Sequence, residues 1–184
     1  MAMWASSSRV VVAAIAAIIA SAAALGGVDA TPETTCRAAA GSDRRVDYEF
    51  CVSRLSQHHD SPDADTWGLA KVAADVGVLI AGNGVYDIKA MLARGKAGAK
   101  ARAPLQRCEA LYDRMGSAFA EAYDGIDRRD YAAGKEKALE AASLARRCGD
   151  AFAGAGVVPS PLAKQGADSV QMAIVCTAIT NLIK

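Results

Sequence analysis

The apolar residues of this chain recur at helical spacing over most of its length. From Leu105 onward they fall alternately three and four residues apart, at Leu105, Cys108, Tyr112, Met115, Phe119, Ala122 and Ile126. This is the period of a helix packed along one seam, whereas a strand would alternate every second residue. Pro104 precedes this run, and the first turn of a helix tolerates proline. We therefore expect a helix to begin at Pro104.

Three further segments show the same period. Asp65 or Thr66 could cap a helix whose apolar positions are Leu69, Val72, Val76 and Ile80. This stripe shifts at residues 82–84, so the segment is either one long helix or two abutting helices. After a polar break at 124–130 comes a third stripe, which ends at Gly154 and Pro159 and comprises Tyr131, Ala138, Ala141, Ala145, Cys148 and Phe152. The last stripe, in 160–184, comprises Val170, Met172, Ile174, Val175, Ile179 and Leu182.

Four amphipathic helices joined by polar connections predict an all-α fold, an up-down four-helix bundle over residues 65–184. Because each stripe has the width of a packing face, we interpret the stripes as core and not as a cofactor site.

The first thirty residues differ from the rest. Arg9 precedes an apolar run, small residues follow up to Gly27, and residues 28–30 form a cleavage site. This order is typical of a secretory signal peptide over residues 1–30, cleaved before Thr31. The alternative is a retained membrane anchor. With a signal peptide, one domain remains over residues 31–184, and we expect no membrane attachment after cleavage.

The 21 basic and 20 acidic residues give a net charge of +1. A nucleic-acid-binding protein would show a clear basic excess, so we expect no nucleic-acid partner.

All five cysteines lie after residue 30, and in an oxidising compartment an odd number suggests two disulfides and one free thiol. Cys108 and Cys148 are equidistant from Arg128 in the polar break, so an antiparallel helix pair places them side by side. Cys36 and Cys51 are likewise centred beside the turn signal at 41–43. A disulfide between Cys36 and Cys51 would link the two helices of an N-terminal hairpin within residues 31–60. Cys176 is then the remaining thiol, on a buried helix, and we expect it to be inert.

Candidate catalytic and metal-binding residues are few. The two histidines, His58 and His59, are adjacent and precede Ser61 and Pro62. We interpret them as part of a polar loop, because zinc ligands converge from separate turns. No nucleophile-elbow, phosphate-loop or dinucleotide motif occurs in the sequence. We expect no catalytic residue, no metal and no cofactor, and an enzyme is the reading with least support.

Five segments together resemble the plant invertase/pectin methylesterase inhibitor family. They are Cys36 with 48–51, 105–113, 129–131, 141–152 and 160–164, the last similar to the branch of invertase-inhibitor-like pollen allergens. The resemblance implies a four-helix bundle after a helical hairpin, with the first and second and the third and fourth cysteines paired. It also implies a secreted apoplastic inhibitor whose helical face fills the substrate cleft of its target in a one-to-one complex, with no reacting group of its own.

One segment of the sequence bears on which enzyme is the target. Invertase inhibitors of this family typically carry Pro-Lys-Phe between the second and third bundle helices, where this chain has Arg129, Asp130 and Tyr131. The departure favours pectin methylesterase as the partner. Acid invertase is the alternative, which the allergen-like last helix favours. A non-inhibitory structural or ligand-binding bundle is a second alternative.

Candidate enzyme-contact residues lie on the second and third bundle helices, opposite their apolar seams, and in the turn between them. They are Arg107, Glu109, Asp113, Arg114, Arg129, Asp130, Tyr131, Lys135 and Glu136. Exposed charges pair weakly and are screened by salt, so simple solvation is the competing interpretation for each. Tyr131 also fits the core stripe.

Overall fold

The computed structural model describes residues 30–94 and 98–184, and the regular structure within these ranges is helical. Residues 1–29, which hold nearly all of the expected signal peptide, lie outside the described part. The helices are α1 (Pro32–Ser42), α2 (Tyr48–Leu55), α3 (Thr66–Ala93), α4 (Ala99–Asp127), α5 (Tyr131–Gly154) and α6 (Ala163–Thr180).

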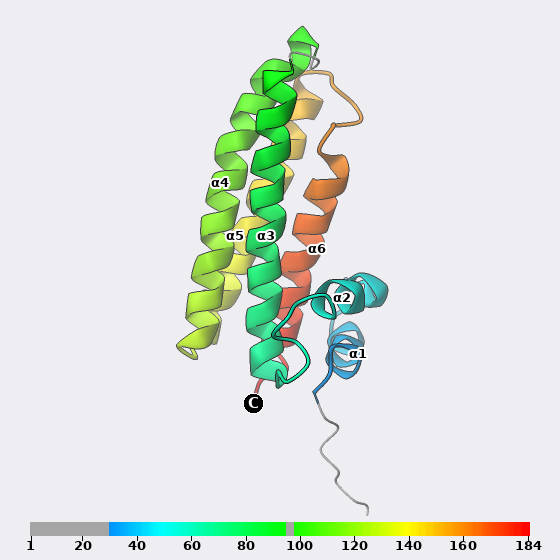
Figure 1. Ribbon diagram of the computed structural model, residues 1–184, viewed down its shortest axis with the longest axis vertical. Helices are drawn as coiled ribbons and strands as arrows, with labels where there is room; N and C mark the ends of the chain where they lie inside the picture. Colours follow the sequence, from blue (N-terminus) through cyan, green and yellow to red (C-terminus); the bar gives the residue numbers. More distant parts are fainter. Residues whose placement is uncertain (1–29, 95–97) are drawn as a thin grey trace, which may run out of the picture.

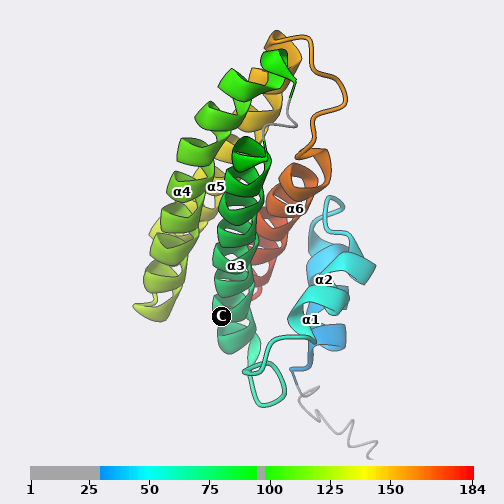
Figure 2. The same cartoon turned by 45° about the horizontal axis from the view of Figure 1, so that its top comes forward.

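The four long helices form an up-down bundle. Helix α4 packs between α3 and α5, and α6 closes the ring by packing against α5 and α3 (Figure 1). The short helices α1 and α2 form a hairpin beside α6 and the first half of α3 (Figure 2). The predicted all-α bundle with an N-terminal helical hairpin is confirmed.

Acidic side chains fix where three of the helices begin. Asp47 accepts a hydrogen bond from the Phe50 amide at 3.0 Å, and Asp65 accepts one from the Gly68 amide at 2.7 Å. Asp130 does the same at the start of α5, accepting from the Ala133 amide at 3.1 Å. Each aspartate satisfies an amide that the first turn leaves unpaired. Of the two candidate caps for α3, the structure therefore selects Asp65.

Helix α3 is continuous through residues 82–84, and the two glycines of that segment have different roles. A Cβ atom built on Gly84 would lie 2.2 Å from the Tyr112 ring, whereas one built on Gly82 would meet nothing within 4 Å. Two helical turns earlier, a Cβ on Gly77 would lie 2.3 Å from the Phe119 ring. Gly77 and Gly84 thus form two notches that receive aromatic rings of α4, and the shift in the apolar stripe marks the second notch.

Two details differ from the sequence-based expectation. Helix α4 begins at Ala99, so Pro104 lies inside it and is buried, where its missing amide removes one hydrogen bond but its φ still suits a helix. The predicted last stripe overruns its helix, because α6 ends at Thr180 and the half-buried Leu182 follows it.

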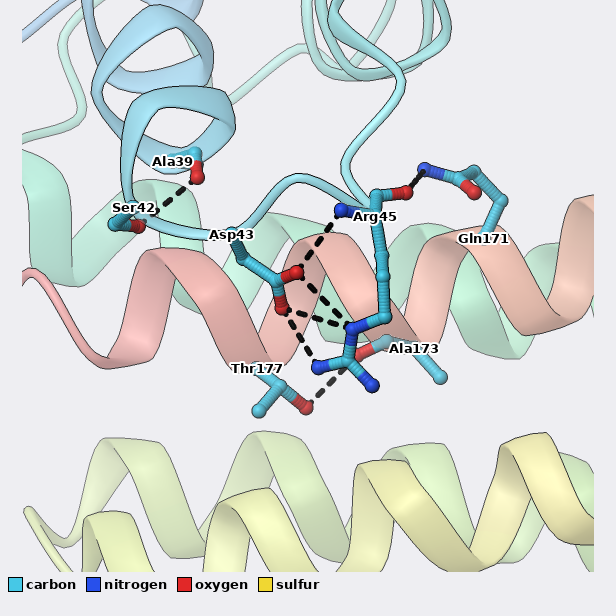
Figure 3. Close-up of polar contacts among 7 residues, drawn as sticks. All are labelled: Ala39, Ser42, Asp43, Arg45, Gln171, Ala173 and Thr177. Atoms are coloured by element: carbon cyan, nitrogen blue, oxygen red, sulfur yellow. Dashed lines mark hydrogen bonds and ion pairs between the residues drawn. The ribbon is translucent and has the colours of Figure 1, made fainter.

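The hairpin is attached to α6 by polar contacts around its turn (Figure 3). The Gln171 side-chain amide donates a hydrogen bond to the Arg45 carbonyl at 3.0 Å, while Asp43 holds the Arg45 guanidinium at 2.7 Å. In the second hairpin helix, Arg54 pairs with Asp168 of α6 at 2.8 Å. These contacts set the position of the hairpin against the bundle.

Tyr112, on α4, is fully buried against α3 and α6. Within the described part of the chain, no residue forms a hydrogen bond with its hydroxyl, and the nearby Ser169 hydroxyl donates instead to the Gln165 carbonyl at 2.8 Å. Burial raises the pKa of Tyr112 to about 12, and the negative charge of Asp168 adds to this increase.

The notch at Gly84 predicts opposite effects for two glycine-to-alanine substitutions in α3. Gly84→Ala should destabilise the protein by about 1–3 kcal/mol, because the new methyl group displaces the Tyr112 ring. Gly82→Ala is the matched control and should stabilise it by about 0.5–1 kcal/mol through helix propensity alone. Urea unfolding with the disulfides intact measures both. Equal shifts in the two variants would mean that Gly84 is not a packing notch.

Tyr112 predicts a loss of stability in alkali. Its folded-state pKa of about 12 exceeds the ordinary value of 10.0, so the protonated phenol favours the folded state. This contribution is complete below pH 10 and is lost as the pH rises towards 12. Tyr112→Phe should be less sensitive to pH in this window, as measured by thermal unfolding, and should lack a rise in tyrosinate absorbance near pH 12. Parallel pH profiles for the two proteins would contradict the assignment.

Candidate functional site

The cysteines lie where they strengthen the scaffold. Cys36 is bonded to Cys51 across the hairpin, and Cys108 is bonded to Cys148 across the α4–α5 pair, which are the two pairs that the sequence predicts. Cys176 has a free thiol and is fully buried on α6. Burial raises the pKa of the Cys176 thiol to about 12. Because the thiolate is the reactive form, this cysteine is chemically inert at neutral pH.

The residues predicted to contact an enzyme are distributed over different edges of the bundle. Glu109 pairs with Lys89 of α3 at 3.8 Å, whereas Arg114 pairs with Glu140 of α5 at 3.5 Å. The first contact lies at the α3–α4 edge and the second at the α4–α5 edge. Arg107 and Asp113 are exposed on α4 and Glu136 is exposed on α5.

Lys135 belongs to a third edge. Its ammonium donates a hydrogen bond to the Asn181 side-chain carbonyl at 2.8 Å, just beyond the end of α6. The nine predicted residues are therefore too dispersed for one flat partner surface to cover them all.

Residues 129–131 build the turn between α4 and α5. Arg129 has a φ of +61°, the left-handed conformation that reverses the chain, and its guanidinium lies 5.0 Å from the centre of the Trp67 ring. Asp130 caps α5, and the half-buried Tyr131 begins this helix. The Tyr131 hydroxyl accepts a hydrogen bond from Arg129 at 3.3 Å. The turn and the start of α5 thus account for the positions of these three residues.

The end of the bundle beside this turn is cross-linked by Trp67. Its indole N–H donates to the Ile126 carbonyl at 2.9 Å, and the Lys71 ammonium lies 3.6 Å from the centre of its ring. Lys71 also pairs with Asp127 at 3.0 Å. These contacts hold the start of α3 against the end of α4.

An exposed apolar strip on α3 was not expected from the sequence. Leu79 is 56% exposed and Tyr86 is 74% exposed, two helical turns apart. Three residues after Tyr86, Lys89 pairs with Glu109 of α4 at 3.8 Å, whereas Leu79 lines a pocket with Arg54 and His58 on the hairpin side. We call Tyr86, Lys89, Glu109 and Asp113 the α3–α4 surface, because Asp113 lies one turn after Glu109 on the same face of α4. The signal was present in the sequence, since Leu79 and Tyr86 are large apolar residues outside the core stripe.

The geometry of the hairpin and the bundle agrees with that of known proteins. The sequence profile of plant invertase/pectin methylesterase inhibitors matches residues 30–179. The chain belongs to this family. It is 76% identical over 159 residues to "Pectinesterase inhibitor 8" of Oryza sativa subsp. japonica, a match that covers 86% of each chain. It is 44% identical to "Pectinesterase inhibitor 12" of the same organism, over 96% of this chain and 85% of the relative.

More distant family members carry another name. A protein of Platanus orientalis named "Putative invertase inhibitor" is 28% identical to this chain, over 81% of this chain and 87% of its own length. Among solved structures, a mutant form of a pectin methylesterase inhibitor from Arabidopsis superposes with a TM-score of 0.64 at 17% identity, covering 84% of this chain and 99% of that one. At this identity the structural likeness supports the fold alone.

Proposed function

We propose that this family member is a secreted protein inhibitor of plant pectin methylesterase and that it blocks the substrate cleft of the enzyme in a one-to-one complex. The observation that carries the proposal is the 76% identity to a rice protein named as a pectinesterase inhibitor. Such an inhibitor regulates pectin methylesterification in the cell wall without turning over any substrate. The chain is thus proposed to act as an enzyme inhibitor and not as an enzyme.

Secretion into the apoplast fits the chemistry of the chain. The signal-like segment at 1–30 would direct the protein out of the cell, and the two disulfides require an oxidising compartment to persist. Both the expected cleavage before Thr31 and the apoplastic location form part of this proposal.

The α3–α4 surface is the part of the inhibitor that we propose to contact the enzyme. Tyrosine is among the residues that contribute most to protein interfaces, because a large rigid ring is buried at small entropic cost. Tyr86 is 74% exposed, and the ion pair between Lys89 and Glu109, one helical turn further along α3, joins this helix to the acidic edge of α4. A specific interface of about 800 Å² per partner would extend well beyond these residues along both helices.

Inhibition of acid invertase is the second candidate function. It is favoured by the 28% identity to the Platanus orientalis protein and by the resemblance of residues 160–164 to the allergen branch. The turn at 129–131 weighs against it, because Arg129 and Asp130 occupy the place where invertase inhibitors typically carry proline and lysine. A non-inhibitory bundle would instead use an apolar cavity of about 490 Å³ lined by Met91, Leu105 and Pro161.

Parallel titration of two enzymes tests the proposed function. The oxidised protein, purified from the medium of a secreting host, should abolish methylester hydrolysis by a plant pectin methylesterase at a one-to-one ratio and at mildly acidic pH. Sucrose hydrolysis by a cell-wall invertase should be unchanged. Inhibition of invertase alone would overturn the choice of target. If the folded protein inhibits neither enzyme, the non-inhibitory bundle is the alternative that remains.

Substitutions on the two sides of the bundle test the proposed contact surface. Tyr86→Ala should raise the inhibition constant for pectin methylesterase at least about tenfold, since a central tyrosine contributes about 2 kcal/mol or more to binding. Leu139→Ala, at a 50% exposed position on α5, is the matched control and should have no effect.

The charged residues of the surface are tested by a pair of reversals. Glu109→Arg with Asp113→Arg should also weaken inhibition, and more strongly at low salt because exposed charges are screened. Glu136→Arg with Asp150→Arg changes the net charge equally on α5 and should not. A weakened α5 pair with an unaffected α4 pair would place the interface on the other side of the bundle.

A further inference from the structure

The loop between α2 and α3 is held in one tightly hydrogen-bonded conformation. The Ser61 hydroxyl donates to the Leu55 carbonyl at 2.6 Å, and the Ser61 amide donates to the His58 carbonyl at 3.2 Å. A cavity of about 430 Å³ lies between this loop and the first half of α3. Its lining includes His58, His59, Asp60 and Asp75.

His58 differs from the polar loop residue expected from the sequence, because it is only 8% exposed. Its Nε2 atom lies 2.9 Å from the Asp75 carboxylate on α3, and its Nδ1 atom lies 3.3 Å from the Asp60 amide. An amide can only donate, so Nδ1 accepts and Nε2 carries the proton that is donated to Asp75. The Nδ1 lone pair is therefore engaged by the Asp60 amide at 3.3 Å, and an ion bound at Nδ1 would replace this hydrogen bond.

His59 and Asp60 complete a group of three ligand atoms. The His59 Nε2 atom lies 3.2 Å from one Asp60 carboxylate oxygen, and the His58 Nδ1 atom lies 3.9 Å from the other. All three ligand atoms lie within 4.8 Å of one another, and the two imidazole rings stack at 4.6 Å. Ligands at about 2.0–2.1 Å from a tetrahedral zinc ion are about 3.3–3.4 Å apart, so the widest separation in the group has to shorten by roughly 1.5 Å. The exposed side chains of His59 and Asp60 are free to make this movement.

The local charges favour a cation at this place. Asp60 and Asp75 supply two carboxylates, whereas the one cationic side chain of the cavity lining, Lys71, already pairs with Asp127 at 3.0 Å. Histidines that bind metal commonly donate their second N–H to a carboxylate, which fixes the tautomer and makes the imidazole a better ligand. The contact between His58 and Asp75 is such an arrangement.

We propose that His58, His59 and Asp60 form a binding site for a divalent ion of the zinc class, with Asp75 as the residue that positions His58 and with one coordination position left to water. This site revises the sequence-based expectation of no metal, which assumed that adjacent histidines cannot converge. The loop brings both rings next to Asp60, and the exposed His59 ring would turn out of the stack on binding, because an imidazole coordinates an ion in its own ring plane. The bound ion would fix the loop onto α3, one helical turn from Leu79.

Calorimetric titration of the tag-free, oxidised protein with zinc chloride tests the site. The chain is purified from the medium of a secreting host and is compared with three variants. The decisive variant is His59→Gln, because this residue is highly exposed and its replacement leaves the core intact. We expect one zinc ion per chain and at least a tenfold loss of affinity in His59→Gln. Asp75→Asn should also lose at least about tenfold, the usual effect of removing a positioning carboxylate.

Asp63→Asn, in the same loop but outside the group, is the matched control and should bind zinc like the unmodified protein. Circular dichroism of each variant verifies that it is folded. The proposal is overturned if the unmodified protein binds no zinc at millimolar concentration, or if folded His59→Gln binds as tightly as the unmodified protein. Equal losses in His59→Gln and Asp63→Asn would likewise contradict it, because they would show a nonspecific effect of the loop.

Discussion

The close approach of α3 and α4 sets the arrangement of the other helices. The Tyr112 and Phe119 rings occupy the space beside Gly84 and Gly77, where any side chain would overlap them. Packing of this density gives a rigid pair, since protein interiors have little free volume to absorb a displaced ring. At the far end of α4, a Cβ on Gly125 would lie 2.7 Å from the Gly134 backbone nitrogen, so the α4–α5 pair meets nearly backbone to backbone.

The covalent and polar links extend this rigidity to the remaining elements. The Cys108–Cys148 bond joins α4 to α5 within the core, and the Cys36–Cys51 bond joins the two hairpin helices. The hairpin shares the hydrophobic core of the bundle through Ala39 and Leu55. It is also fixed to α6 by Gln171 (Figure 3) and by Asp168. A protein with these links keeps one shape in the free state.

A scaffold of this kind suits inhibition by occlusion. Binding costs less free energy when neither the backbone nor the interface side chains must be ordered on association. The α3 helix contributes most here, because its inner side is fixed by the two aromatic rings while its outer side carries Leu79 and Tyr86. The same helix supplies Asp75 to the histidine loop, so the proposed metal site and the proposed contact surface share one rigid element.

The four long helices, their order and both cysteine pairs follow from the sequence, because helical period is a local property and the symmetry of an antiparallel hairpin depends only on spacing along the chain. The sequence did not determine whether residues 82–84 interrupt α3, since a glycine that relieves a clash and a glycine that weakens a helix look alike in sequence. Most of the predicted contact residues lie opposite the apolar stripe of their helix. This position can be read from one helix at a time. Which of them share an edge, and the contact between His58 and Asp75, depend on the packing of segments that are distant in the chain, so neither could be predicted before the fold was known.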